Sequence, residues 1–174
     1  PEFVHYKWGL LGSLFMTKHW FWFTEPKNIT GAAMVNFFTY QNIQHPDFNK
    51  KEGLTTIIDL NKPIEEIYNN FRTNFIQKQI RRGERNKIII KHDQDFKNFK
   101  ILYQKFRQVH KLPKERLRPM KEVGEFFSAY YQGEIIAGGL FITNGIVMRA
   151  WALASQTGSQ TLSREIVGQA NRMV

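Results

Sequence analysis

Apolar residues recur every three or four positions in two stretches, which is the pattern of amphipathic helices. Pro63 suits the first turn of the first helix and Asn61 suits its N-cap. The apolar face of this helix consists of Ile64, Ile67, Tyr68, Phe71, Phe75 and Ile80. The second helix follows Asp93, and its apolar face consists of Phe96, Phe99, Leu102, Tyr103, Phe106, Val109 and His110. The pattern predicts two basic helices on a common core.

Short β-branched and alternating runs predict strands. Residues 87–91, Lys-Ile-Ile-Ile-Lys, are too few for a helix and are expected to form a strand. Three further strands are expected at residues 126–131, 134–142 and 146–154. Gln132-Gly133 and Asn144-Gly145 supply tight turns between them. We therefore expect an antiparallel meander, followed by a polar loop over 155–163 and a helix that begins near Arg164.

The N-terminal third has a weaker pattern. Residues 19–24 and 32–40 are expected to be strands that flank a turn at 25–31, and residues 55–60 to be a further strand. Gly138-Gly139, in the middle of a strand, indicates a bulge or close packing against a helix. The last residues, up to Val174, belong to an amphipathic helix, so we expect the sheet to be incomplete in this sequence. The fold class is α+β.

The net positive charge of the chain indicates an anionic binding partner. The chain has 174 residues and a formal net charge of +10. Residues 62–118 contain sixteen Lys or Arg and six Asp or Glu, so this stretch carries the whole excess. Nucleotides, phosphates, nucleic acids and anionic lipids are partners that such a stretch favours.

Several kinds of chemistry are excluded or disfavoured. The chain has no cysteine, which excludes disulfides, thiolate nucleophiles and thiolate metal sites. Its five histidines show no paired spacing, so we expect no metal. No apolar run has the length of a membrane span, and no signal peptide is evident at the first residues, so the cytoplasm is the default expectation.

From residue 87 onward the expected order of elements is strand, helix, short helix, three antiparallel strands, loop and helix. This order resembles the first two-thirds of a GNAT-type acyltransferase domain. In that superfamily the fourth strand, here 146–154, lends its backbone to the pantetheine arm of acyl-CoA. The next helix begins with a phosphate-binding turn that has Gln or Arg, then Gly three residues later, then Gly or Ala. Glu165, Gly168 and Ala170 occupy these positions here, with Glu165 in place of Gln or Arg.

Three stretches also resemble Fem-type transferases, in which a strand ending in Asp-Leu, a helix and an Arg-rich segment join two GNAT-like domains. They are 55–68, 75–86 and 167–172, and the last of these resembles a Gly-x-Ala-Asn-Arg helix of smaller, acetyltransferase-like relatives. The resemblance implies three units. Residues 1–60 would be a partial first GNAT-like domain, 61–86 a basic linking helix, and 87–174 a second GNAT-like domain without its C-terminal strands.

The resemblance implies the transfer of an acyl or aminoacyl group to an amine. The donor would be acyl-CoA or, as the alternative, aminoacyl-tRNA, and the acceptor a cell-wall or saccharide precursor that carries the amine. The donor-binding residues that it implies are Trp151, Ala152, Leu153, Ala154, Gly168, Gln169, Ala170 and Asn171. No catalytic residue is assigned, because the 146–154 strand has no acidic residue that could act as a base.

Four arginines are candidates for binding an anionic donor or acceptor, since guanidinium groups match phosphate oxygens. They are Arg81, Arg82, Arg85 and Arg149. The alternative for the first three is a solvated helix C-terminus, where cations offset the helix dipole. Trp8, Trp20, Trp22 and Trp151 either stack on a base or belong to the core. We expect Arg149, Trp151 and Leu153 to share one face of the 146–154 strand, and Met148, Ala150, Ala152 and Ala154 to share the other.

A second class of function stays open, namely a non-catalytic basic module that holds RNA or another anionic partner. Steep loss of binding with salt, without turnover of any acyl donor, would distinguish this module from an enzyme.

Overall fold

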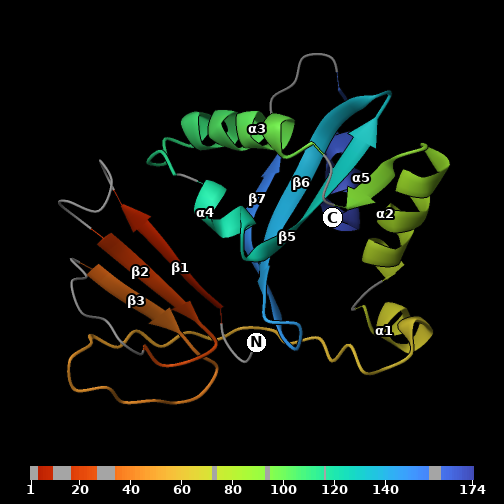
Figure 1. Cartoon of the computed structure of the whole chain (residues 1–174). Coiled ribbons are helices and arrows are strands. Elements are labelled where there is room, and N and C mark those ends of the chain that lie inside the picture. The colour runs from red at the N-terminus through yellow and green to blue at the C-terminus, as the bar shows by residue number, and fades with distance from the viewer. Residues whose placement is uncertain are drawn as a thin grey trace.

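The computed structural model describes residues 4–9, 17–26, 34–71, 74–92, 95–115, 117–156 and 162–174. It has a mixed α+β fold with two separate sheets, as the sequence predicts for the class (Figure 1). A three-stranded sheet contains the N-terminal strands, and a four-stranded sheet contains the rest.

The N-terminal sheet consists of β1 (Val4–Gly9), β2 (Thr17–Trp22) and β3 (Met34–Phe38). The pair β1 and β2 is antiparallel, whereas β2 and β3 are parallel. The strand β1 was not expected from the sequence, and the expected turn at 25–31 lies mostly outside the described residues. Parallel pairing means that β2 and β3 do not form a hairpin.

The second sheet is the predicted antiparallel meander. Its strands are β4 (Ile89–His92), β5 (Gly124–Tyr131), β6 (Glu134–Thr143) and β7 (Met148–Ser155), and they lie side by side in chain order. All three pairings are antiparallel. Both predicted turns place a glycine at positive φ, 84° for Gly133 and 85° for Gly145, where a side chain would strain the backbone. Local turn chemistry thus sets the register of this sheet.

The structure has a helix pair where one long basic helix was expected. They are α1 (Ile64–Asn70), with Phe71 as its C-cap, and α2 (Asn74–Arg85). Pro63, not Asn61, is the N-cap of α1, and it makes no side-chain capping bond. The other helices are α3 (Phe96–Val109), α4 (Arg118–Lys121) and α5 (Arg164–Met173). Among the described residues, none of the helices is long and apolar enough to cross a membrane.

The strand predicted at residues 55–60 is wrong. All six residues are exposed and have no strand partner within the described chain. Ile57 is 71% exposed and Ile58 is 52% exposed. Their β-branched side chains give this segment strand propensity, but propensity forms a strand only where a neighbouring edge accepts the backbone hydrogen bonds.

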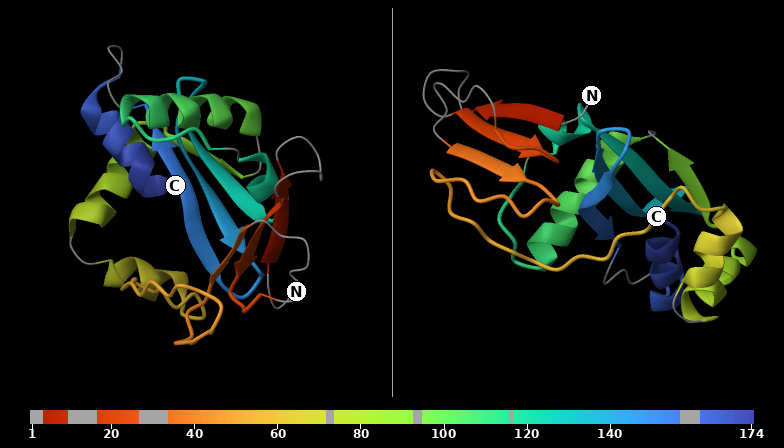
Figure 2. Two further views of the ribbon diagram at one scale, coloured as in Figure 1. Left: turned by 90° about the vertical axis from the view of Figure 1, so that its left-hand side faces the viewer. Right: turned by 90° about the horizontal axis from the view of Figure 1, so that it is seen from below.

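The helices α3 and α5 cover opposite faces of the four-stranded sheet (Figures 1 and 2). Adjacent residues of a strand point to opposite faces, and Gly138 and Gly139 on β6 show this directly. A Cβ on Gly138 would lie 2.7 Å from the Phe99 ring of α3, whereas one on Gly139 would lie 3.0 Å from Val174 after α5. The expected close packing of these glycines is confirmed. We call the two sides the α3 face and the α5 face.

A bulge in β7 sets which of its side chains lie on each face. Leu140 pairs with Ala152 and Phe141 pairs with Ala150, so Trp151 has no partner on β6. The strict alternation expected for this strand is therefore wrong, because an extra residue shifts the pattern. Trp151 packs on the α3 face with the core residues Ala152 and Ala154.

Replacing Gly138 by alanine is expected to destabilise the fold. The new methyl group would meet the Phe99 ring, which is fully buried and has no room to move. We expect a loss of about 1–3 kcal/mol in the free energy of unfolding, measured by urea denaturation. Gly53→Ala is the matched control, because a Cβ at Gly53 has no atom within 4 Å. Equal stability of the two variants would contradict this packing.

Candidate anion-binding groove

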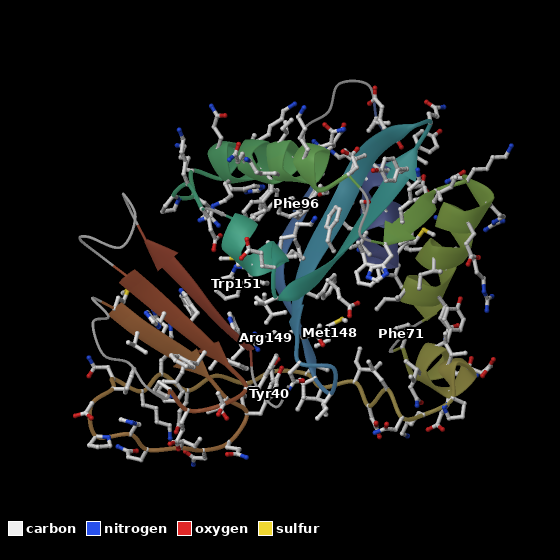
Figure 3. The ribbon with its side chains drawn as sticks, viewed as in Figure 1. Tyr40, Phe71, Phe96, Met148, Arg149 and Trp151 are labelled. Carbon is white, nitrogen blue, oxygen red and sulfur yellow. The ribbon has the colours of Figure 1, made fainter. Side chains whose placement is uncertain are left out.

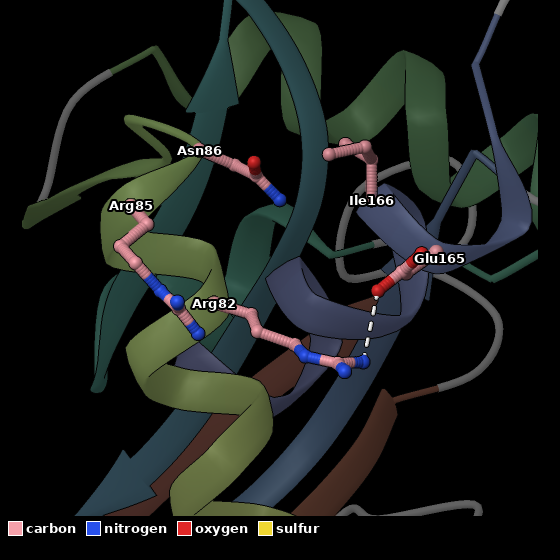
Figure 4. A pocket seen from close by; sticks show the side chains of 5 residues that line it. All are labelled: Arg82, Arg85, Asn86, Glu165 and Ile166. Carbon is pink, nitrogen blue, oxygen red and sulfur yellow. Dashed lines mark hydrogen bonds and ion pairs between the residues drawn. The ribbon is translucent and has the colours of Figure 1, made fainter.

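The end of α2 and the start of α5 border an open groove of about 490 Å³ (Figure 4). Its lining residues are Arg82, Arg85, Asn86, Glu165 and Ile166. The groove brings together two regions that the sequence analysis singled out separately, the Arg-rich segment and the start of the last helix. About eighty residues separate them in the chain.

The two helices run antiparallel across the groove. At one end Arg82 pairs with Glu165, and at the other end the Arg172 guanidinium lies 4.9 Å from the centre of the Phe75 ring. The C-terminus of α2 therefore lies beside the N-terminus of α5. Arg82 and Arg85 lie in the last turn of α2, where a cation offsets the helix dipole. Glu165 lies in the first turn of α5, where an anion does the same.

A short network of hydrogen bonds holds the carboxylate of Glu165. Arg82 Nη1 lies 3.1 Å from Glu165 Oε1, and Gln169 Nε2 donates to the same oxygen at 3.2 Å. Asn86 Nδ2 in turn donates to Gln169 Oε1 at 2.7 Å. Glu165 is thus directed along the groove wall toward α2. The carboxylate that stands in place of the Gln or Arg of the GNAT pattern is paired with a guanidinium.

The groove has the chemistry of a site for a phosphate-bearing ligand. Two guanidinium groups and one carboxylate give it a net charge of +1. Ser163 caps α5 by accepting a hydrogen bond from the Ile166 amide at 3.2 Å, so Ile166 lies in the first turn, where the helix dipole attracts anions. Arg85 makes a hydrogen bond only to a backbone oxygen among the described contacts, that of Arg81 at 3.4 Å. Its guanidinium is therefore the group that is most available to a ligand.

The other two predicted arginines lie elsewhere. The Arg81 guanidinium lies 5.9 Å from the centre of the Tyr68 ring, toward α1. The Arg149 guanidinium lies 4.1 Å above the Phe38 ring of the N-terminal sheet. Figure 3 shows Arg149 and Trp151 on the side of β7 that faces this sheet, with Met148 on the other side.

The four β7 residues implied in donor binding divide between the two faces. The Trp151 ring lies between the N-terminal sheet and β7, 4.8 Å from the Trp22 ring and 5.4 Å from the Trp20 ring. Ala152 and Ala154 are buried in the same core, whereas Leu153 is 53% exposed on the α5 face. The side chains of Trp151, Ala152 and Ala154 are therefore packed in the core and are not available to a ligand. The outer edge of β7 has no strand partner among the described residues, so its backbone groups are what a ligand could reach.

The helix residues implied in donor binding lie beyond the first turn of α5. Gly168 is the fifth residue of the helix, and a Cβ there would meet only the Arg172 guanidinium, at 3.4 Å. Gln169 and Ala170 are fully buried, and Asn171 donates to Ser155 Oγ at 3.0 Å. Of these four residues, Gln169 connects to the groove through its bonds to Asn86 and Glu165.

Asn86 and Ile166 were missed by the sequence analysis. Asn86 follows the Arg-rich run directly, and Ile166 follows Glu165, so both are next to predicted residues. Nothing in the sequence indicates that these two neighbourhoods meet. Their contact arises because α2 packs along α5.

Comparisons with known proteins add no identity. No protein-family model and no curated protein matches the chain. The described residues also contain no cluster of three His, Asp or Glu side chains that could hold a metal ion.

Removing the negative charge of the groove is expected to strengthen anion binding, and removing its positive charges is expected to weaken it. Glu165→Gln raises the net charge and releases Arg82, so the affinity for inorganic pyrophosphate should rise by up to about fivefold, the factor given by about 1 kcal/mol. Arg82→Gln together with Arg85→Gln should weaken it. Calorimetry measures both. The control is Lys100→Gln with Lys105→Gln on the exposed side of α3, and an equal loss in this control would contradict a local site.

Proposed function

We propose that the chain is an N-acyltransferase of GNAT type that takes its acyl group from a phosphate-bearing donor. The observation that carries the proposal is the meander β4 to β7 with α3 and α4 after its first strand and α5 after its last. This is the order of elements in the part of a GNAT domain that binds acyl-CoA. The groove at the start of α5 supports the proposal, since it supplies two guanidinium groups beside Glu165, the first residue of the turn that the resemblance assigns to the donor phosphates.

The proposal has two forms, which differ in the donor. The groove favours the form in which the donor is acyl-CoA. Its phosphates would lie between Arg85, Arg82 and the first turn of α5. Its amide-bearing arm would follow the outer edge of β7, where backbone N–H and C=O groups are available for β-type hydrogen bonds. Because Arg82 pairs with Glu165, the carboxylate repels the phosphates less than an unpaired carboxylate would.

The reaction would join the acceptor amine to the donor carbonyl. A deprotonated amine attacks the carbonyl carbon, the new C–N bond forms, and the C–S bond breaks with the proton passing to the leaving thiolate. In this scheme the protein aligns the two reactants and offers backbone amides to the developing oxyanion. We assign no catalytic base.

Within the Fem-like form of the proposal, residues 1–60 belong to a first GNAT-like domain, 61–86 link the two domains, and 87–174 belong to the second. The donor would then be aminoacyl-tRNA, and the acceptor a cell-wall or saccharide precursor with a free amine. The basic residues of α2 would contact the tRNA backbone in this form.

The proposal predicts that loss of Arg85 affects only donors that carry phosphates. Arg85→Gln should weaken acetyl-CoA binding in calorimetry by about tenfold, because a charge-assisted contact is lost. Acetyl transfer to a primary amine from acetyl-pantetheine, which has no phosphates, should be unchanged. Lys100→Gln is the charge-matched control.

Three outcomes decide among the forms of the proposal. Binding and turnover of acetyl-CoA support the acyl-CoA form. Turnover from aminoacyl-tRNA without acetyl-CoA binding moves the assignment to the Fem-like form. Salt-sensitive RNA binding without turnover of either donor overturns the enzyme and favours the non-catalytic module.

A further inference from the structure

The helix α5 covers only part of the α5 face of the four-stranded sheet. We call the remaining part of this face the open face. Its residues come from all four strands and are His92, Glu125, Phe127, Phe141, Met148, Ala150 and Leu153. His92 pairs with Phe127, Phe127 with Gly139, and Gly139 with Leu153, so these positions form one row across the sheet. All seven side chains are exposed or half-buried.

A stack of aromatic rings gives the open face a fixed shape. The His92 ring lies flat on Phe127, with centroids 4.6 Å apart and an interplanar angle of 13°. Phe127 meets Phe141 edge to face at 5.6 Å. Phe141 folds over Gly139, where a Cβ would lie 2.7 Å from its ring. The glycine therefore lets the aromatic row lie close to the sheet.

Glu125 is the only carboxylate among the seven residues. Its Oε2 lies 3.3 Å from His92 Nε2, and 39% of its side chain is exposed. Two cations of neighbouring elements, Lys91 beside His92 on β4 and Arg172 near the end of α5, are directed elsewhere. The Lys91 ammonium lies over the Tyr130 ring on the α3 face, and Arg172 bonds to the Gly168 carbonyl and lies over Phe75. The Glu125 carboxylate gives this apolar surface a local negative charge that is complementary to a cation.

Stability alone gives little reason for this arrangement. An ion pair this exposed contributes about 0–1 kcal/mol. Leu153 is 53% exposed and Met148 is 38% exposed, and they lie on the same face as the half-buried Phe127 and Phe141, so the apolar side chains form a patch. A carboxylate at one end of a shaped apolar surface is instead the arrangement that binds an organic cation with an apolar body.

We infer that the open face binds the amine-bearing acceptor, with a cationic group of the acceptor on Glu125 and its apolar body across Phe127, Phe141 and Leu153. His92 is a positioning residue that fixes the carboxylate from the side. The inference rests on the proposed function, because it assigns the acceptor of that reaction. It also adds a substrate class, namely acceptors that carry a cationic group remote from the reacting nitrogen.

The spacing of the strands determines how far the cationic group on Glu125 lies from the reacting nitrogen. Glu125 lies on β5, which is two strands from β7, so it is about 10 Å from the strand along whose outer edge the donor arm is proposed to lie. A group on Glu125 is therefore bound too far from the donor to react. It would instead orient an acceptor whose other end reaches β7, so Glu125 acts in specificity.

The test is an NMR titration of the full chain with phenethylamine, an aromatic primary amine, in the absence of any donor. We expect saturable shifts of the His92 ring, Phe127, Phe141 and Leu153 signals. Glu125→Gln should weaken binding about tenfold or more, since it removes a charge-assisted contact. The charge-matched control is Glu122→Gln on an exposed residue outside the open face. The neutral analogue 2-phenylethanol should bind the wild type as weakly as phenethylamine binds the Glu125→Gln variant.

Two results would overturn the inference. They are the absence of saturable shifts on the open face, and equal affinity of wild type and Glu125→Gln for phenethylamine when both have the same melting temperature. Failure here with acetyl-CoA binding intact removes the acceptor site and leaves the proposed function standing. Amine binding on the open face without turnover of any donor would support the amine site and overturn the proposed transferase function.

Discussion

The contact between Trp22 and Trp151 determines which surfaces of the molecule are available for function. Trp22 is 1% exposed, and its ring meets Trp151 at a centroid distance of 4.8 Å with an interplanar angle of 80°. Edge-to-face pairs of this kind are favourable beyond the area that they bury. The contact joins the N-terminal sheet to β7 and closes the α3 face at that strand. The outer edge of β7 and the open face lie outside this contact.

The bulge at Trp151 makes this contact possible. Without the extra residue, Trp151 would point to the face opposite that of Ala152 and Ala154. With it, the indole ring packs in the same core as these alanines, and Leu153 is directed to the α5 face. One register shift therefore closes one face of β7 and leaves apolar side chains on the other. The antiparallel packing of α2 and α5 adds the second surface, because it places a basic helix end beside the start of the last helix.

Local signals in the sequence were enough to predict the meander. Asn144-Gly145 and Gln132-Gly133 set the turns within a few residues, and the pairing follows from them. The mid-strand pair Gly138-Gly139 indicated either a bulge or close packing against a helix, and the structure shows close packing of Gly138 against Phe99. Arg82 and Arg85 were identified by their charge. Local signals failed at residues 55–60. Strand propensity depends on the local sequence, but a strand also needs a neighbouring strand edge, which depends on the tertiary structure.

The features that arise from long-range packing could not be predicted. The bulge at Trp151 depends on the N-terminal sheet, which covers the indole ring. The pairing of Arg82 with Glu165 joins residues 83 positions apart, and the sequence pattern of either helix is compatible with many packings. The position of Glu125 beside His92 follows from pairing of β4 with β5 across two intervening helices. Each of these contacts is a tertiary event with no local signature.

Amide chemical-shift mapping with coenzyme A tests the central claim most directly, because it locates the ligand without assuming a reaction. The account predicts that the largest shifts fall on Arg82, Arg85, Asn86, the first turn of α5 and the outer edge of β7. The part of the open face on β4 and β5, namely His92, Glu125 and Phe127, should change little, since the donor does not reach Glu125. Shifts confined to the exposed basic side of α3, or spread evenly over all basic residues, would contradict the account and indicate nonspecific anion binding.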